Sequence, residues 1–131
     1  MIEITKVYEF EAAHHLPYHQ GACQHLHGHS YKLEVTVTTW FAFCINAEDE
    51  KNPESGMIMD FSTLKEVIKK CAPFDHTNLN AHFANPTAEN MVGHIAYEIT
   101  KWLEKKHPRK RVIRVRLWET KTSYATWRAN E

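Results

Sequence analysis

The alternation of side chains along residues 27–38 constrains the fold more than any other feature of the chain. Residues 31–38 switch between apolar and polar types at every step, which is the pattern of a strand with one buried face. The apolar positions of that face are Tyr31, Leu33, Val35 and Val37. Carried backwards, the same period places His29 and His27 on the buried face, and Gly28 between them adds no side chain to the opposite surface.

A third imidazole lies at the end of an earlier stretch with the same period. The apolar residues of one parity there are Ile2, Ile4, Tyr8, Phe10 and Ala12, with Lys6 as the exception. His14 continues this parity, so pairing the two strands as neighbours brings His14, His27 and His29 to one point. Three protein nitrogens with an open fourth position are typical of a catalytic zinc site.

The competing interpretation is that ten histidines in 131 residues cluster by chance. We assign that interpretation to the histidines without a parity argument, namely His15, His19, His25, His82, His94 and His107. For the other three, the shared parity favours a metal site, with zinc as the expected ion because imidazole ligands suit it.

Cys23 precedes His27 by four residues, and its role stays open between three alternatives. A nearby divalent cation favours the thiolate, which can act as a base or a nucleophile. The thiol could instead be a fourth metal ligand that closes the site, or a buried bystander. The other two cysteines, Cys44 and Cys71, lie in apolar surroundings at unrelated spacings, so we expect free packing thiols rather than disulfides.

Length and charge exclude several classes of protein. A chain of 131 residues fits one domain, residues 1–131. Sixteen basic and sixteen acidic residues cancel, which argues against a nucleic-acid surface or a polybasic membrane contact. There is no signal-peptide pattern and no apolar run near the length of a membrane span. We therefore expect a soluble cytoplasmic protein.

The remaining patterns predict an α+β domain. Asp60 or Ser62 can cap one helix, and Pro86 with Thr87 can open a second. Two strands, two helices and two strands in that order favour a four-stranded antiparallel sheet with both helices on one face. The expected elements are strands at residues 2–14, about 27–43, 113–117 and 124–128, a first helix from its cap at Asp60 or Ser62 to about residue 71, and a second helix from Pro86 and Thr87 to Pro108.

Two of these elements also predict which side chains are buried. In the first helix the apolar stripe is Phe61, Leu64, Val67 and Ile68. In the third strand the buried positions are Ile113, Val115 and Leu117, and Glu119 falls on the same parity. A carboxylate there is costly unless paired. It could form an ion pair with an inward basic group, or it could accept two N–H donors from a flat heterocycle.

Together these motifs resemble the 6-pyruvoyl-tetrahydropterin synthase family over nearly the whole chain. The matching pieces are Phe10-Glu11-Ala12-Ala13-His14, Cys23 with His27-Gly28-His29-Ser30, residues 56–61, Phe74-Asp75-His76 with Leu79-Asn80, Asn85-Pro86-Thr87 with Glu89, and Glu119-Thr120. The resemblance implies the tunnelling fold, with subunits joined edge to edge into trimeric β-barrels and two trimers stacked into a homohexamer. Closing a barrel also removes exposed sheet edges.

The resemblance also implies roles for single residues. His14, His27 and His29 would hold zinc. Cys23 would accept a proton, and Asp75 and His76 would relay protons. Glu119 would grip the pterin ring, and Thr87 and Glu89 would contact the substrate. Active sites of the family form where subunits meet, so residues of one pocket can come from different chains.

The spacing of the cysteine favours one branch of the family. Three residues separate Cys23 from His27, as in bacterial carboxy-forming members, whereas pyruvoyl-forming animal members have five. The implied reaction converts 7,8-dihydroneopterin triphosphate to 6-carboxy-5,6,7,8-tetrahydropterin, acetaldehyde and triphosphate, towards queuosine. A pyruvoyl-forming lyase and a non-catalytic zinc-stabilised pterin-binding module are the alternatives. The chain departs from the family at His15, where relatives carry Arg, in the long stretch 39–55, and after Thr120.

Overall fold

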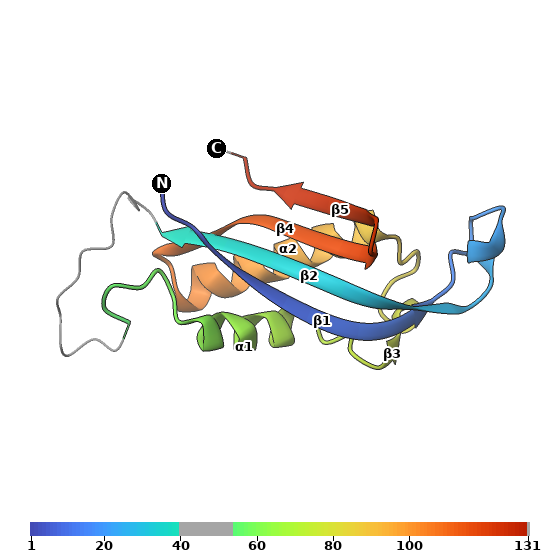
Figure 1. The fold of residues 1–131 in the computed structure, drawn as a ribbon, viewed down its shortest axis with the longest axis horizontal. Helices are drawn as coiled ribbons and strands as arrows, with labels where there is room; N and C mark the ends of the chain where they lie inside the picture. Colours follow the sequence, from blue (N-terminus) through green and yellow to red (C-terminus); the bar gives the residue numbers. More distant parts are fainter. Residues whose placement is uncertain (40–53, 131) are drawn as a thin grey trace.

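The computed structural model describes residues 1–39 and 54–130, and the fold is α+β as expected (Figure 1). Its strands are β1 (Ile4–His14), β2 (His27–Thr39), β3 (Thr77–Asn78), β4 (Lys110–Thr120) and β5 (Ser123–Arg128). Its helices are α1 (Phe61–Cys71) and α2 (Ala88–Lys106), with short 3-10 turns η1 (Ala22–Gln24) and η2 (Leu79–Ala81). Across the described ranges, no helix is long and apolar enough to cross a membrane.

Within the described residues the sheet has five strands in the order β3-β1-β2-β4-β5, so the prediction of four antiparallel strands is wrong. The four long strands do pair antiparallel, but β3 pairs parallel to β1, with Thr77 opposite Ala12 and Asn78 opposite Ala13. Two residues are too few to produce a visible alternation. For that reason β3 left no signal in the sequence.

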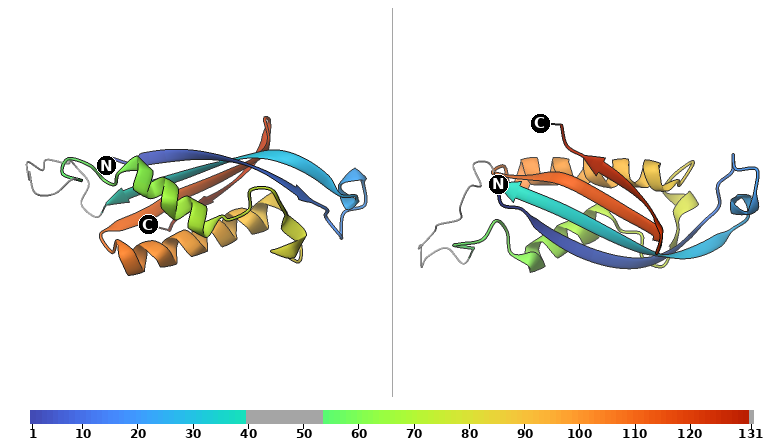
Figure 2. Two further views of the ribbon diagram at one scale, coloured as in Figure 1. Left: turned by 90° about the horizontal axis from the view of Figure 1, so that it is seen from below. Right: turned by 45° about the horizontal axis from the view of Figure 1, so that its top comes forward.

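Both helices cover one face of the sheet, as predicted (Figure 2). Each helix begins at a capping side chain: Asp60 accepts from the Ser62 N–H at 2.8 Å, and Thr87 accepts from the Asn90 N–H at 3.1 Å. The buried helical residues are Leu64, Val67, Ile68 and Cys71 in α1, and Ala88, Met91, Val92, Ile95, Ala96, Ile99 and Leu103 in α2. They pack on the sheet residues Phe10, Tyr31, Leu33, Val35, Val37, Val115 and Leu117.

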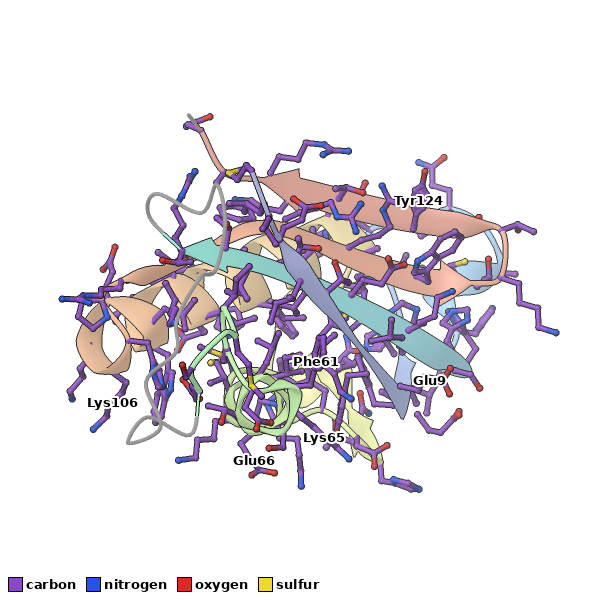
Figure 3. All side chains as sticks on the ribbon, turned by 60° about the vertical axis from the view of Figure 1, so that its left-hand side comes forward. Glu9, Phe61, Lys65, Glu66, Lys106 and Tyr124 are labelled. Carbon is purple, nitrogen blue, oxygen red and sulfur yellow. The ribbon has the colours of Figure 1, made fainter. Side chains whose placement is uncertain are left out.

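Two predicted core positions are wrong. Phe61 is 52% exposed because it is the first residue of α1 and lies at the edge of the stripe (Figure 3). In β4 a bulge shifts the register, so that Thr36 pairs with Arg114 but Val37 pairs with Val112. The bulge buries Val112 and leaves Ile113 partly exposed.

Some expectations lie partly or wholly outside the described residues. These are the continuation of the second strand to residue 43, the stretch 39–55 and the packing role of Cys44. The other packing thiol, Cys71, is free and buried. Burial raises the pKa of this thiol to about 11, which keeps it protonated and suits a packing role.

Candidate metal centre

The pairing of β1 with β2 brings the three predicted histidines together. His14 lies directly opposite His27, and Ala12 lies opposite His29, so all three rings share the helix-facing side of the sheet. One ligand atom from each ring can be chosen so that all three lie within 4.8 Å of one another. His14 is fully buried, whereas His27 and His29 are partly exposed, so the cluster is open on one side.

Hydrogen bonds fix which nitrogens of two rings carry protons. His14 Nδ1 lies 2.9 Å from the Pro86 carbonyl oxygen, and His27 Nδ1 lies 2.7 Å from the His25 carbonyl oxygen. Because a carbonyl oxygen only accepts, both Nδ1 atoms donate, and the Nε2 atom of each neutral ring is bare. These two Nε2 atoms are 3.0 Å apart. Two lone pairs at that distance repel each other unless a metal ion, or a proton on one of the two rings, lies between them.

His29 offers a third nitrogen without a hydrogen-bond partner. Its Nε2 is buried, and nothing within the described structure donates to it or accepts from it. Burial also lowers the pKa values of His14 and His29, which favours the neutral rings that a metal requires. Three neutral imidazoles with convergent nitrogens fit a tetrahedral zinc ion with one open position.

Glu119 completes the polar cluster from β4. Its Oε1 lies 3.3 Å from His29 Nε2, although the angle does not suit a hydrogen bond. The negative charge of Glu119 tends to raise the pKa values of His14 and His29. Burial has the larger effect and lowers them. The inward carboxylate therefore lies beside an imidazole of the cluster. This position is compatible with a ligand-binding role for the remaining carboxylate oxygen.

Asp75 and His76 form a second polar pair at the edge of the sheet. Asp75 Oδ1 accepts from the Glu11 N–H at 3.0 Å, and Asp75 Oδ2 lies 3.0 Å from His76 Nδ1. The Glu11 N–H and then His76 hold the pKa of Asp75 below its usual value. Adjacent side chains can meet here because His76 has a φ of 59°, an uncommon conformation for this residue type.

A pocket of about 490 Å³ lies beside this pair at the edge of the sheet. Its lining includes His76 and, from the histidine cluster, His29, together with Leu26 from the loop before β2 and Gly28 within the strand. A cavity of this volume holds a small ligand. The side chain of His76 is 80% exposed, so it is free to meet such a ligand.

Cys23 does not join the metal-ligand group. It lies in η1, is partly buried and is a free thiol, and the convergent group among the described residues consists of the three histidines. Its carbonyl accepts from the Leu16 N–H at 2.8 Å, which closes the loop between β1 and β2. This arrangement gives no support to the interpretation of Cys23 as a fourth ligand, and its role as a base stays a prediction.

The two remaining predicted site residues begin α2. Thr87 is the cap, and its hydroxyl is occupied by the Asn90 N–H. Glu89 is exposed in the first turn, where a carboxylate complements the helix dipole. Both residues therefore have structural roles in the helix, and substrate contact by Thr87 or Glu89 stays a prediction.

The sequence reasoning missed the groups that surround His14. These are the Pro86 carbonyl and the hydroxyl of Tyr31, which lies 3.3 Å from His14 Nδ1. Burial raises the pKa of Tyr31, so the hydroxyl stays neutral. A backbone carbonyl cannot be recognised from residue types, because every residue has one. Tyr31 could have been recognised, because it follows His29 on the same buried face of the strand.

Comparison with known proteins finds one family that matches nearly the whole chain. The family model described as 6-pyruvoyl tetrahydropterin synthase matches residues 3–130. Proteins named 6-carboxy-5,6,7,8-tetrahydropterin synthase are similar to the chain: one from Bacillus subtilis is 31% identical, covering 96% of this chain and 84% of its own. Another, from Rickettsia bellii, is 32% identical and covers 76% and 80%.

A solved structure shares the fold. The 6-pyruvoyl tetrahydropterin synthase of Caenorhabditis elegans superposes with a TM-score of 0.73 at 22% identity, covering 98% of this chain and 96% of its own.

Proposed function

Since the chain belongs to the 6-pyruvoyl tetrahydropterin synthase family, we propose that it is a zinc-dependent lyase acting on 7,8-dihydroneopterin triphosphate. With one water molecule consumed, the proposed products are 6-carboxy-5,6,7,8-tetrahydropterin, acetaldehyde and triphosphate, in a cytoplasmic route towards queuosine. The observation that carries the proposal is the cluster of three imidazoles with two bare Nε2 atoms 3.0 Å apart. The carboxy-forming reaction is preferred because of the names of the curated relatives and the short Cys23–His27 spacing.

In this proposal His14, His27 and His29 hold the zinc ion. When bound, zinc supplies Lewis-acid polarisation of the substrate hydroxyls and makes neighbouring protons more acidic. Glu119 lies beside the cluster at the end of β4. A carboxylate there can accept two N–H donors from the edge of a pterin ring and so fix the ring next to the histidines.

Two groups are proposed to move protons. Cys23 removes a proton from the substrate side chain as a thiolate. His76, held by Asp75 at 3.0 Å, supplies or takes up another proton as the ring tautomerises. The exposure of His76 and the cavity that it shares with His29 support this assignment.

We further propose that subunits join edge to edge into closed trimers and that two trimers form a hexamer. The support is the sheet itself. Among the described strands, β5 has a neighbour on one side only, and β3 covers only two residues of the opposite edge. Glu9 and Tyr124 mark the strands near these two edges in Figure 3. Such an assembly would let residues of neighbouring subunits complete one pocket.

The product decides between the alternatives. We expect incubation of the zinc-loaded protein with dihydroneopterin triphosphate to give 6-carboxy-tetrahydropterin by mass spectrometry and trappable acetaldehyde. A 6-pyruvoyl product without acetaldehyde would assign the chain to the pyruvoyl-forming reaction. No conversion by a zinc-loaded hexamer, verified by light scattering, would favour a pterin-binding module.

A further inference from the structure

Apart from the predicted substrate contacts of Thr87 and Glu89, two motifs between α1 and the first turn of α2 have no role in the proposed reaction. They are Leu79-Asn80, in η2, and the turn from Asn85 to Asn90. Both lie against the end of β1, where His14 is the last residue of the strand. Their side chains hydrogen-bond to the backbone on two sides of His14: at His15, and at the turn that carries Pro86.

Asn80 holds the backbone immediately after His14. Its Oδ1 accepts from the His15 N–H at 2.8 Å, and its Nδ2 donates to the His15 carbonyl oxygen at 3.0 Å. The amide side chain thus makes the two backbone hydrogen bonds that a neighbouring strand would make with one residue. Asn80 is itself fixed, because its N–H donates to Asn78 Oδ1 at 3.0 Å and Asn78 lies in β3 beside β1.

This pair of hydrogen bonds requires an amide at residue 80. An ionised aspartate could accept from the His15 N–H but could not donate to its carbonyl. The two bonds lie in a partly buried region, where leaving a backbone group without a partner is unfavourable. Asn80 therefore fixes the path of the chain that carries His14.

Asn90 holds the carbonyl that orients the ring of His14. Its Nδ2 donates to the Asn85 carbonyl at 2.8 Å, and the Thr87 N–H donates to the same oxygen at 2.9 Å. These bonds close a tight turn around Pro86, whose backbone is already restricted by its ring. The turn directs the Pro86 carbonyl at His14 Nδ1, 2.9 Å away in a buried contact.

We propose that Asn80 and Asn90 are positioning residues of the metal centre: Asn80 fixes the backbone of His14, and Asn90 fixes its tautomer through Pro86. The inference rests on the proposed function in one respect, that the three histidines hold zinc. His14 needs such support because its ring partner is 72 residues away in the chain. The ring of His27, by contrast, is held by His25 within its own loop.

The test compares Asn80→Ala and Asn90→Ala with Thr5→Val as a matched control. Thr5 also makes a partly buried hydrogen bond on β1, at 2.7 Å to Thr36, but at the far end of the strand from His14. Zinc affinity is measured by competition with a chromophoric chelator, and stability of the zinc-free proteins by thermal unfolding. Loss of an outer partner of a metal ligand typically weakens metal affinity about 10–100-fold.

We expect both alanine variants to bind zinc at least about 10-fold more weakly, and Thr5→Val to bind it like the unsubstituted protein despite a comparable loss of stability. Unchanged zinc affinity in the alanine variants would overturn the inference while leaving the proposed function intact. An unsubstituted protein that binds no zinc would overturn both. If Asn80→Ala does not fold, Asn90→Ala decides, since Asn90 is an exposed residue of the first turn of α2.

A second measurement separates positioning from general destabilisation. In the zinc-loaded protein the His14 Nδ1 proton should exchange slowly with solvent, because it is buried and bonded to Pro86. Nitrogen-edited NMR should show faster exchange of this proton in Asn90→Ala and no change in Thr5→Val. Equal exchange in the two variants would refute the role assigned to Asn90.

Discussion

Replacement of His27 by alanine should abolish the stabilisation of the protein by zinc. His27 supplies one of the two Nε2 atoms that face each other at 3.0 Å, and two imidazoles do not hold zinc tightly. At a free zinc concentration 100 times the dissociation constant, binding to the native state alone contributes about 2.7 kcal/mol. With an unfolding entropy of about 2.1 cal/mol/K per residue, the 131 residues convert this into a rise of about 10 °C in Tm.

The assay is thermal unfolding followed by circular dichroism, with and without zinc. We expect the rise of about 10 °C for the unsubstituted protein and no zinc-dependent rise for His27→Ala. His94→Ala is the control, because His94 is an exposed imidazole of α2 outside the cluster. An equal zinc-dependent rise in His27→Ala would show that zinc binds elsewhere and would refute the assignment of the metal centre.

Three further predictions concern the same site. Zinc-free protein should become less stable to urea as the pH falls below about 6.5. Burial lowers the pKa values of His14 and His29 in the folded state, so the unfolded chain takes up protons first as the pH falls. Stability that is constant between pH 7.5 and 5.5 would contradict this. Cys23→Ala should keep zinc, measured by elemental analysis, and lose turnover by at least about 100-fold, whereas loss of zinc would make the thiol a ligand. Glu119→Gln should weaken pterin binding by calorimetry about 10–100-fold, the value of a hydrogen bond to a charged group, and unchanged affinity would exclude Glu119 as the ring anchor.

The clustering of the three histidines could be predicted because side chains alternate between the two faces of a strand with a period of two residues. Once the parity of Tyr31 and Leu33 assigns one face of β2, the positions of His27 and His29 follow without further information. The antiparallel pairing then places His14 opposite His27. The capping residues of the two helices were equally readable, since Asp60 and Thr87 have side chains that bond to the first turn.

What the sequence did not reveal are features that depend on tertiary contacts. The bulge that buries Val112 instead of Ile113 arises between β2 and β4, and no local pattern announces it. Strand β3 exists because the loop after α1 reaches the edge of β1. The contact between Pro86 and His14 uses a backbone carbonyl, which every residue possesses, so residue types carry no information about it.

The histidines are held partly by the β1–β2 hairpin and partly by the segment that begins α2, so the site forms only when both parts are in place. The β1–β2 hairpin alone brings His14, His27 and His29 to one place, and the bond from His27 to His25 is local to it. The orientation of His14, however, requires Pro86 and therefore the docked N-terminus of α2. If these histidines hold zinc as proposed, tight binding depends on packing of the helical layer against the sheet, and therefore on the completed tertiary structure rather than on the hairpin alone.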